Sequence, residues 1–160
     1  MSDLNGGASD SQISEDASVR VHNADAATVA KLHDNVAKLK NVKVAIKEQT
    51  DGLLVQVKGT SAHSSELASG ETAIATFAEV FKGIDLEHTS DGQAFEFINQ
   101  LIVLDLYGAQ FGYIGYEHDF MGPMTVSPTV ITRQGTDIKL SVHMRRPVGK
   151  EEARTKRQLN

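Results

Sequence analysis

One histidine of the sequence follows a turn of small residues between a predicted strand and a predicted helix. The apolar alternation ends near Lys58, and Gly59–Ala62 lead through small side chains to His63. Such a turn displays one imidazole, a side chain that transfers protons near neutral pH, at the rim of a sheet. A surface histidine in a polar loop gives the same pattern. The residues alone leave both interpretations open.

Neighbouring histidine and carboxylate side chains are the other candidates for chemistry, because zinc and similar ions take such ligands. They occur in two predicted elements and in two polar flanking segments: His33-Asp34, Glu117–Asp119, Glu15-Asp16 and Glu151-Glu152. None has a second histidine at ligand spacing within one element. We therefore predict that these side chains are solvated and that the chain provides no metal ligands.

The composition excludes several classes of protein. The chain has 160 residues, 40% hydrophobic and 23% charged, which is enough for about one globular domain. A net charge of −5 argues against a nucleic-acid partner, and the absence of cysteine excludes disulfides and thiolate metal sites. No apolar run has transmembrane length, and the first residues do not resemble a signal peptide. We expect a cytoplasmic protein without a membrane partner.

Hydrophobic alternation predicts the strands that lead to His63. Residues 19–21, 42–47 and 53–57 alternate apolar with polar side chains, as strands with one buried face do. Asp51-Gly52 is a hairpin signal between the last two segments. Further along, residues 125–132 and 136–146 form a second predicted hairpin. The second strand of that hairpin has a polar face made of alternate residues: Lys139, Ser141, His143 and Arg145.

Apolar residues three or four apart predict helices over residues 23–39, 71–84 and 90–107. The last of these has apolar residues around much of its circumference, so we expect it to be buried on more than one side. Each predicted helix has residues suited to its N-terminus. They are Asn23 or Asp25 for the first helix, Gly70-Glu71 for the second, and Ser90–Gln93, as a capping box, for the third. Residues 111–119 are predicted to form a loop or a short irregular strand.

This order of elements predicts an α+β domain, with an antiparallel sheet and helices packed on one face. The domain is expected to span residues 17–148. Residues 1–16, rich in Ser, Gly and Asp, are predicted to be a partly flexible N-terminal segment. Residues 149–160, which are basic and polar, are predicted to be a C-terminal tail.

Four segments, in order along the chain, resemble motifs of a known family. Lys58–His63, followed by Gly70 and Ala73, resembles the Gly-x-x-Ala-His turn of the lid domain in the zinc aminopeptidase–carboxypeptidase–aminoacylase family. The others resemble its Gly-Gly…Asn-x-Val-Pro-Asp/Glu-x-Ala, Met-Gly-Asp-Leu-Thr-x-Asn-x-Gly and Ile-Arg-Tyr-Pro segments: Gly6–Ala17, Met121–Pro128 and Met144–Pro147. With the insertion Gly92–Asp119, the order resembles that of bacterial V-type dipeptidases, which cleave unblocked dipeptides including β-Ala-His.

The resemblance implies a ferredoxin-like lid domain that binds substrate for a metal-dependent dipeptidase, a peptide hydrolase. It implies that His63 stabilises the oxyanion, that Arg145 binds the dipeptide's C-terminal carboxylate, and that Ser11 takes the place of a substrate-contacting Asn. Zinc or another divalent ion would be held by a catalytic domain of the same polypeptide, through His-x-Asp and Glu-Glu motifs. These motifs are missing here, and residues 149–160 resemble the start of a truncated lid element. The isolated chain is therefore expected to be inactive.

Several positions depart from the family pattern. Ser11 lacks the amide N–H of Asn, and Arg146 replaces the Tyr that follows the family's Arg. Leu67 replaces a Pro, and Thr72 replaces the Asn at the helix start. The alternative interpretation is a stand-alone α+β interaction or dimerisation module, which would form a homodimer through an edge of the sheet or a helix. Metal motifs in flanking segments of the natural gene would favour the dipeptidase interpretation.

Overall fold

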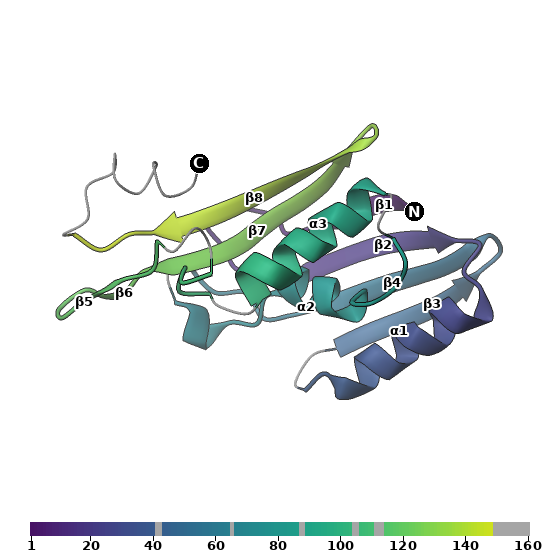
Figure 1. The fold of residues 1–160 in the computed structure, drawn as a ribbon, viewed down its shortest axis with the longest axis horizontal. Coiled ribbons are helices and arrows are strands. Elements are labelled where there is room, and N and C mark those ends of the chain that lie inside the picture. Colours follow the sequence, from purple (N-terminus) through teal and green to yellow (C-terminus); the bar gives the residue numbers. More distant parts are fainter. Residues whose placement is uncertain (41–42, 65, 87–88, 104–105, 111–113, 149–160) are drawn as a thin grey trace.

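A six-stranded antiparallel sheet with three α-helices forms the described part of the chain, which confirms the α+β class (Figure 1). The computed structural model describes residues 1–40, 43–64, 66–86, 89–103, 106–110 and 114–148. The strands are β1 (Ser2–Gly6), β2 (Asp16–His22), β3 (Lys43–Gln49), β4 (Gly52–Lys58), β7 (Thr125–Gln134) and β8 (Asp137–Arg145), with a separate short pair, β5 (Glu117–His118) and β6 (Gly122–Pro123). The helices are α1 (Ala26–Lys38), α2 (Ala73–Val80) and α3 (Ser90–Ile98), with a 3-10 turn η1 (Leu67–Ser69) and a π-helical stretch η2 (Asn99–Val103).

The N-terminal strand β1 lies inside the sheet, whose order is β3-β4-β2-β1-β7-β8. The prediction that residues 1–16 lie outside the domain is therefore wrong for Ser2–Gly6, which pairs with β2 on one side and β7 on the other. Leu4 is the only large apolar residue of β1 and is 2% exposed. Because one apolar residue makes no periodic pattern, alternation does not signal this strand, which is fixed by pairing on both of its edges. Residues 149–160 lie outside the described residues.

The predicted strands around the first hairpin are confirmed. In β2, the side chains of Ala17, Val19 and Val21 are buried, and the intervening residues are at least partly exposed. This alternation is that of a sheet covered by helices on one face only. Helix α1 begins after Asp25, whose carboxylate accepts a hydrogen bond of 2.7 Å from the backbone N–H of Thr28. Asp25 is thus one of the two predicted caps of this helix.

Helix α2 begins later than predicted. Glu71 is not in its first turn, because the backbone of Glu71 exchanges two hydrogen bonds of 3.0 Å with Thr60. Thr72 caps the helix instead, with its hydroxyl facing the backbone N–H of Ala75. A Cβ on Gly59 would lie 2.0 Å from the Glu71 carbonyl oxygen. Only glycine allows this close approach, which holds the turn that carries His63 against the helix start.

Helix α3 also begins differently. Thr89, not Ser90, accepts the capping hydrogen bond, from the Gly92 backbone N–H at 3.0 Å. The Ser90 hydroxyl instead donates to the Thr136 carbonyl oxygen at 2.6 Å, so the predicted capping box is wrong. The helix ends at Ile98 and continues as η2 rather than as α-helix to residue 107. It packs against α2 and against β8, two different neighbours, as its wide apolar girth predicts.

The core lies between the sheet and the helices. Apolar side chains of β2, β4 and β7 pack against α2, α3 and Leu32 of α1 in one cluster. Phe77, Phe81 and Phe95 form its aromatic centre, with ring centroids 5.1 to 5.5 Å apart. Within the described residues, no helix has the length and apolar character to cross a membrane.

Candidate functional site

The β7–β8 hairpin has a polar face that points away from α3. Opposing residues share a face in an antiparallel pair, and here Thr125 faces Arg145 while Ser127 faces His143. The alternate residues of β8, including Val142, border the groove beneath α3 instead. The polar face, which we call the outer face, is nevertheless buried at its β7 positions, because Thr125 and Ser127 are 4% and 0% exposed.

The turn after β4 lies against this outer face. The hydroxyl of Ser64 is 2.8 Å from Nδ1 of His143. The neighbouring ring of His63 is nearly perpendicular to that of His143, with centroids 6.4 Å apart. Ser64 is fully buried, whereas His63 is exposed. The strand-to-helix turn therefore holds an accessible imidazole beside the buried polar face of a strand far away in sequence.

The segment that contains Ser11 lies beside the same turn. The Ser64 backbone N–H donates to the Ser11 carbonyl oxygen at 3.0 Å, and Gln12 forms a β-bridge with His63. The Ser11 hydroxyl is 3.2 Å from that of Ser9. The structure thus brings the backbone of Ser11 to the site, while its side chain contacts another serine.

Arg145 lines a cavity at one end of the outer face. This cavity has a volume of about 160 Å³, and its walls also include Thr125, Tyr107 and the turn from Glu66 to Ala68. The guanidinium makes a long contact of 3.5 Å with the Met121 carbonyl oxygen. None of the ion pairs among the described residues includes Arg145. A cation beside a cavity, with no carboxylate of the described residues at pairing distance, is suited to an anionic ligand.

Two hydroxyl groups of the outer face are buried without a hydrogen-bond partner among the described residues. They are Thr125 Oγ1 and Ser127 Oγ, on consecutive outward positions of β7. Buried hydroxyls nearly always have a partner, because leaving one unpaired costs about 1–3 kcal/mol. Their position beside Arg145 and His143 is therefore consistent with a face that contacts water or a ligand.

Three residues predicted for the site, His63, Ser11 and Arg145, come from distant segments, and the contacts above bring these segments to one end of the outer face. The predictions missed Ser64 and His143. His143 had a signal, since it alternates with Arg145 on the polar side of a predicted strand. Ser64 had none, because nothing in a polar loop marks one serine as buried.

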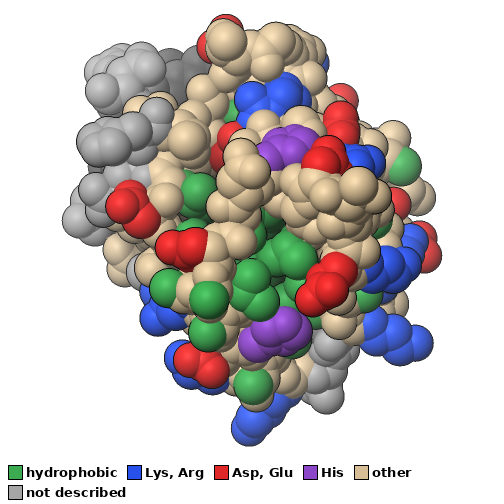
Figure 2. All heavy atoms as spheres, turned by 90° about the vertical axis from the view of Figure 1, so that its right-hand side faces the viewer, with side chains coloured by type: hydrophobic (Ala, Val, Ile, Leu, Met, Phe, Trp, Pro, Cys, Tyr) green, Lys and Arg blue, Asp and Glu red, His purple; other side chains and the backbone are tan. Residues whose placement is uncertain are grey.

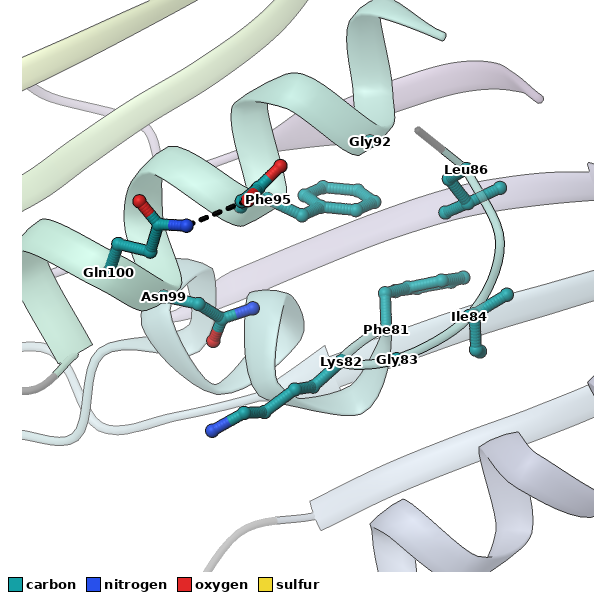
Figure 3. Close-up of a pocket in the computed structure, with 10 residues that line it drawn as sticks. Phe81, Lys82, Gly83, Ile84, Leu86, Gly92, Phe95, Asn99 and Gln100 are labelled. Carbon is teal, nitrogen blue, oxygen red and sulfur yellow. Dashed lines mark hydrogen bonds between the residues drawn. The ribbon is translucent and has the colours of Figure 1, made fainter. Parts of the chain in front are cut away.

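Among the residues that the structure describes, no group of three or more His, Asp or Glu side chains lies close enough to hold an ion. A second cavity, of about 260 Å³, lies between the segment that follows α2 and one side of α3 and η2 (Figure 3). The rings of Phe81 and Phe95 stack beside it, and Gln100 donates to Glu96 at 2.7 Å on its rim. It contains none of the predicted site residues.

Another histidine, His22, is the last residue of β2 and has serine and aspartate neighbours. Its Nε2 is 2.8 Å from the Ser2 hydroxyl and its Nδ1 is 3.6 Å from Asp51. This arrangement does not suit nucleophilic catalysis. The Ser2 hydroxyl also donates to Asp3, and a carboxylate at that point would repel a developing oxyanion. Arg20 pairs with both Asp3 and Asp51, so the cluster is a network of exposed charges.

The surface around the two hairpin turns mixes both signs of charge. Figure 2 shows basic and acidic side chains interspersed on this face, around apolar side chains near its middle. Such a face has no extended basic patch of the kind that nucleic acids require. Comparison with protein-family models and with curated proteins gives no match to the chain.

Proposed function

We propose that this chain is the substrate-binding lid domain of a metal-dependent dipeptidase that acts on unblocked dipeptides in the cytoplasm. The observation that carries the proposal is the convergence of three motif segments. The segments that contain Ser11, His63 and Arg145 meet at one end of the outer face. Their meeting supports a common site, since the resemblance selected them by sequence alone.

In this proposal Arg145 holds the free C-terminal carboxylate of the dipeptide, for which a planar guanidinium with two parallel donors is suited. The exposed imidazole of His63 donates a hydrogen bond to the oxygen on which charge develops. Removing such a donor costs about 3–4 kcal/mol of transition-state stabilisation in other enzymes. In this proposal zinc or a similar ion would be held by a catalytic domain of the same polypeptide, as the resemblance implies, and would supply an activated water.

The proposal also includes a ferredoxin-like arrangement of strands and helices. The order β2-α1-β3-β4-α2, with β4 between β2 and β3, matches the first five elements of a βαββαβ unit. In that unit the last strand follows the second helix and pairs with the first strand. Here β1, from the other end of the chain, pairs with β2 at that position. The agreement therefore extends to five elements of six.

The proposal can be tested by steady-state kinetics on the protein that the complete natural reading frame encodes. The frame should encode His-x-Asp and Glu-Glu metal motifs beside this domain. In the resulting enzyme, His63→Ala should mainly lower kcat, because its contact strengthens as charge develops. Arg145→Ala should mainly raise KM for free dipeptides and should matter less for dipeptide amides. A frame without metal motifs, or unchanged kinetics in both variants, would contradict the proposal.

The alternative proposal, an interaction module, has its own observation. Strand β8 is at the edge of the sheet, and a groove of about 570 Å³ lies between it and α3. The groove is lined by Leu140 and Val142, and by Phe97, which is 39% exposed. A homodimer through this edge predicts that Leu140→Lys converts a dimer to a monomer in sedimentation experiments. A monomeric wild-type chain would contradict it.

A further inference from the structure

Ser64 and His143 form a hydrogen-bonded pair that the proposed roles of His63 and Arg145 do not use. We infer that His143 is a second donor to the carboxylate that Arg145 binds, and that Ser64 holds its imidazole in the tautomer that this role requires. The inference rests on the proposed function and deepens it. It adds a specificity-determining residue for the anionic end of the substrate.

The tautomer follows from the burial of Ser64. Its side chain is 0% exposed, and its hydroxyl bonds within the described residues only to Nδ1 of His143, at 2.8 Å. If Nδ1 carried the ring proton and donated it, the serine hydroxyl proton would be buried without an acceptor among the described residues, which costs free energy. Ser64 therefore donates and Nδ1 accepts. The proton of the neutral ring is then on Nε2, the nitrogen farther from the backbone.

The distal N–H of His143 and the guanidinium of Arg145 are placed to share one carboxylate. The two residues are separated by one position on β8, so their side chains leave the same face about 6.7 Å apart. Two charge-assisted hydrogen bonds of about 2.8 Å, one to each carboxylate oxygen, span a separation of that size. The hydroxyls of Thr125 and Ser127, which have no partner in the described ranges, lie on the residues directly opposite these two.

The polar groups around this face include several that can donate hydrogen bonds to an anion. Glu66 lines the cavity beside Arg145, yet no ion pair joins these two among the described residues. His63 adds a second imidazole beside that of His143. The guanidinium of Arg145 and the imidazole of His143 are thus both near the place where the carboxylate would bind. A ligand with a neutral amide at this position would satisfy the same donors without the charge assistance, so we expect weaker binding.

Nuclear magnetic resonance on the isolated chain tests both parts of the inference. The ¹⁵N shifts of His143 at pH 8 should show protonated Nε2 and unprotonated Nδ1. Titration with N-acetylalanine, a minimal carboxylate probe, should shift the His143 ring and the Arg145 guanidinium. N-acetylalanine amide should bind measurably more weakly.

Two substitutions of His143 test the roles of its two ring nitrogens separately. His143→Asn keeps a polar atom near the position of Nδ1 but loses the distal donor, so affinity for N-acetylalanine should fall about tenfold. His143→Gln keeps a donor near Nε2 and should recover most of that loss. His33→Asn, on an exposed position of α1, is the matched control and should change nothing. Thermal melts verify that each variant is folded.

The outcomes distinguish this inference from the proposed function. A ring proton on Nδ1, or wild-type affinity in His143→Asn with weakened binding in Arg145→Ala, would overturn the inference alone. Absence of N-acetylalanine binding, or affinity unaffected by both substitutions, would overturn the carboxylate site itself and with it the proposed role of Arg145.

Discussion

Strands β2 and β7 belong to one sheet, yet they bury their residues in different ways. In β2, buried apolar residues alternate with partly exposed polar ones, so one face packs on helices and the other meets solvent. In β7, the first five residues are all buried, Thr125–Thr129, including three polar ones. The outer face is thus covered at β7 and open at β2.

The difference indicates where the sequence departs from what stability alone would select. At β2 the polar face retains its hydration, and the apolar face contributes burial energy. At β7 the hydroxyls of Thr125 and Ser127 are buried, and neither has a hydrogen-bond partner among the described residues. Departures of this kind occur at functional sites more often than elsewhere, and the candidate site lies on this face.

The largest expected effect concerns the helix-covered face, because most of the buried apolar side chains lie there. Phe77 is 1% exposed and contacts both Phe81 and Phe95. Phe77→Ala should reduce the free energy of unfolding by about 3–5 kcal/mol through lost burial and a residual cavity. Phe120→Ala, at a side chain 93% exposed, is the control and should leave it unchanged. Equal effects in urea denaturation would contradict this assignment.

A buried ion pair on the helix side of β7 should give the next effect. Arg133 pairs with Asp91 at the start of α3, and the two side chains are 22% and 3% exposed. Asp91→Asn should destabilise the chain by about 2–3 kcal/mol, because it leaves a partly buried guanidinium without its counter-charge. Lys58→Ala removes the exposed pair with Asp16 and should cost less than about 0.5 kcal/mol. Chemical denaturation at neutral pH measures both, and similar losses would contradict the role of burial.

A serine of the outer face, Ser127, and one that lies against it, Ser64, differ in hydrogen bonding but not in burial. Ser64→Ala removes the partner of His143 and should cost about 1–2 kcal/mol. Ser127→Ala removes a hydroxyl that has no hydrogen-bond partner within the described part of the chain, and it should leave stability unchanged or slightly raised. The two residues are equally buried, so matched thermal melts isolate hydrogen bonding from burial. A comparable loss in both would mean that Ser127 has a bound water as its partner.

The sequence predicted best those elements that have strong periodicity. The hairpins β3–β4 and β7–β8 and helix α1 agree with prediction to within a few residues. The starts of α2 and α3 did not agree, because long-range pairing decided them. Glu71 pairs with Thr60, and Ser90 bonds to Thr136, and neither partner is visible from local pattern. Strand β1 was missed for the same reason.

The candidate site was predicted in part. His63 and Arg145 were selected through resemblance, since a lone histidine and a strand arginine have ordinary solvated explanations. The pairing of Ser64 with His143 depends on how the turn after β4 packs against β8, 79 residues away along the chain. No periodicity or spacing encodes such a contact. Side-chain partners across distant elements are therefore what the structure adds.

The smallest expected effect is a pH dependence at the β2 end, where surface groups remain hydrated. The Thr28 backbone N–H, followed by the Thr28 hydroxyl, holds the pKa of Asp25 below its ordinary value of 3.8. A carboxyl with a lowered folded-state pKa stabilises the native state fully above its unfolded-state pKa. That contribution disappears as pH falls through the folded-state pKa.

Asp25→Asn separates the charge of this cap from its geometry, because asparagine also caps helices well. Its stability difference from wild type should be small and constant between pH 7 and pH 5, and should shrink as pH falls below about 4. Urea denaturation of both proteins across this range measures the difference. The change should be confined to α1, so the His143 ring resonances should be the same in wild type and variant at each pH. A difference there would mean that the cap at the β2 end is coupled to the buried face of β7, and the two ends of the sheet could not then be treated as separate regions.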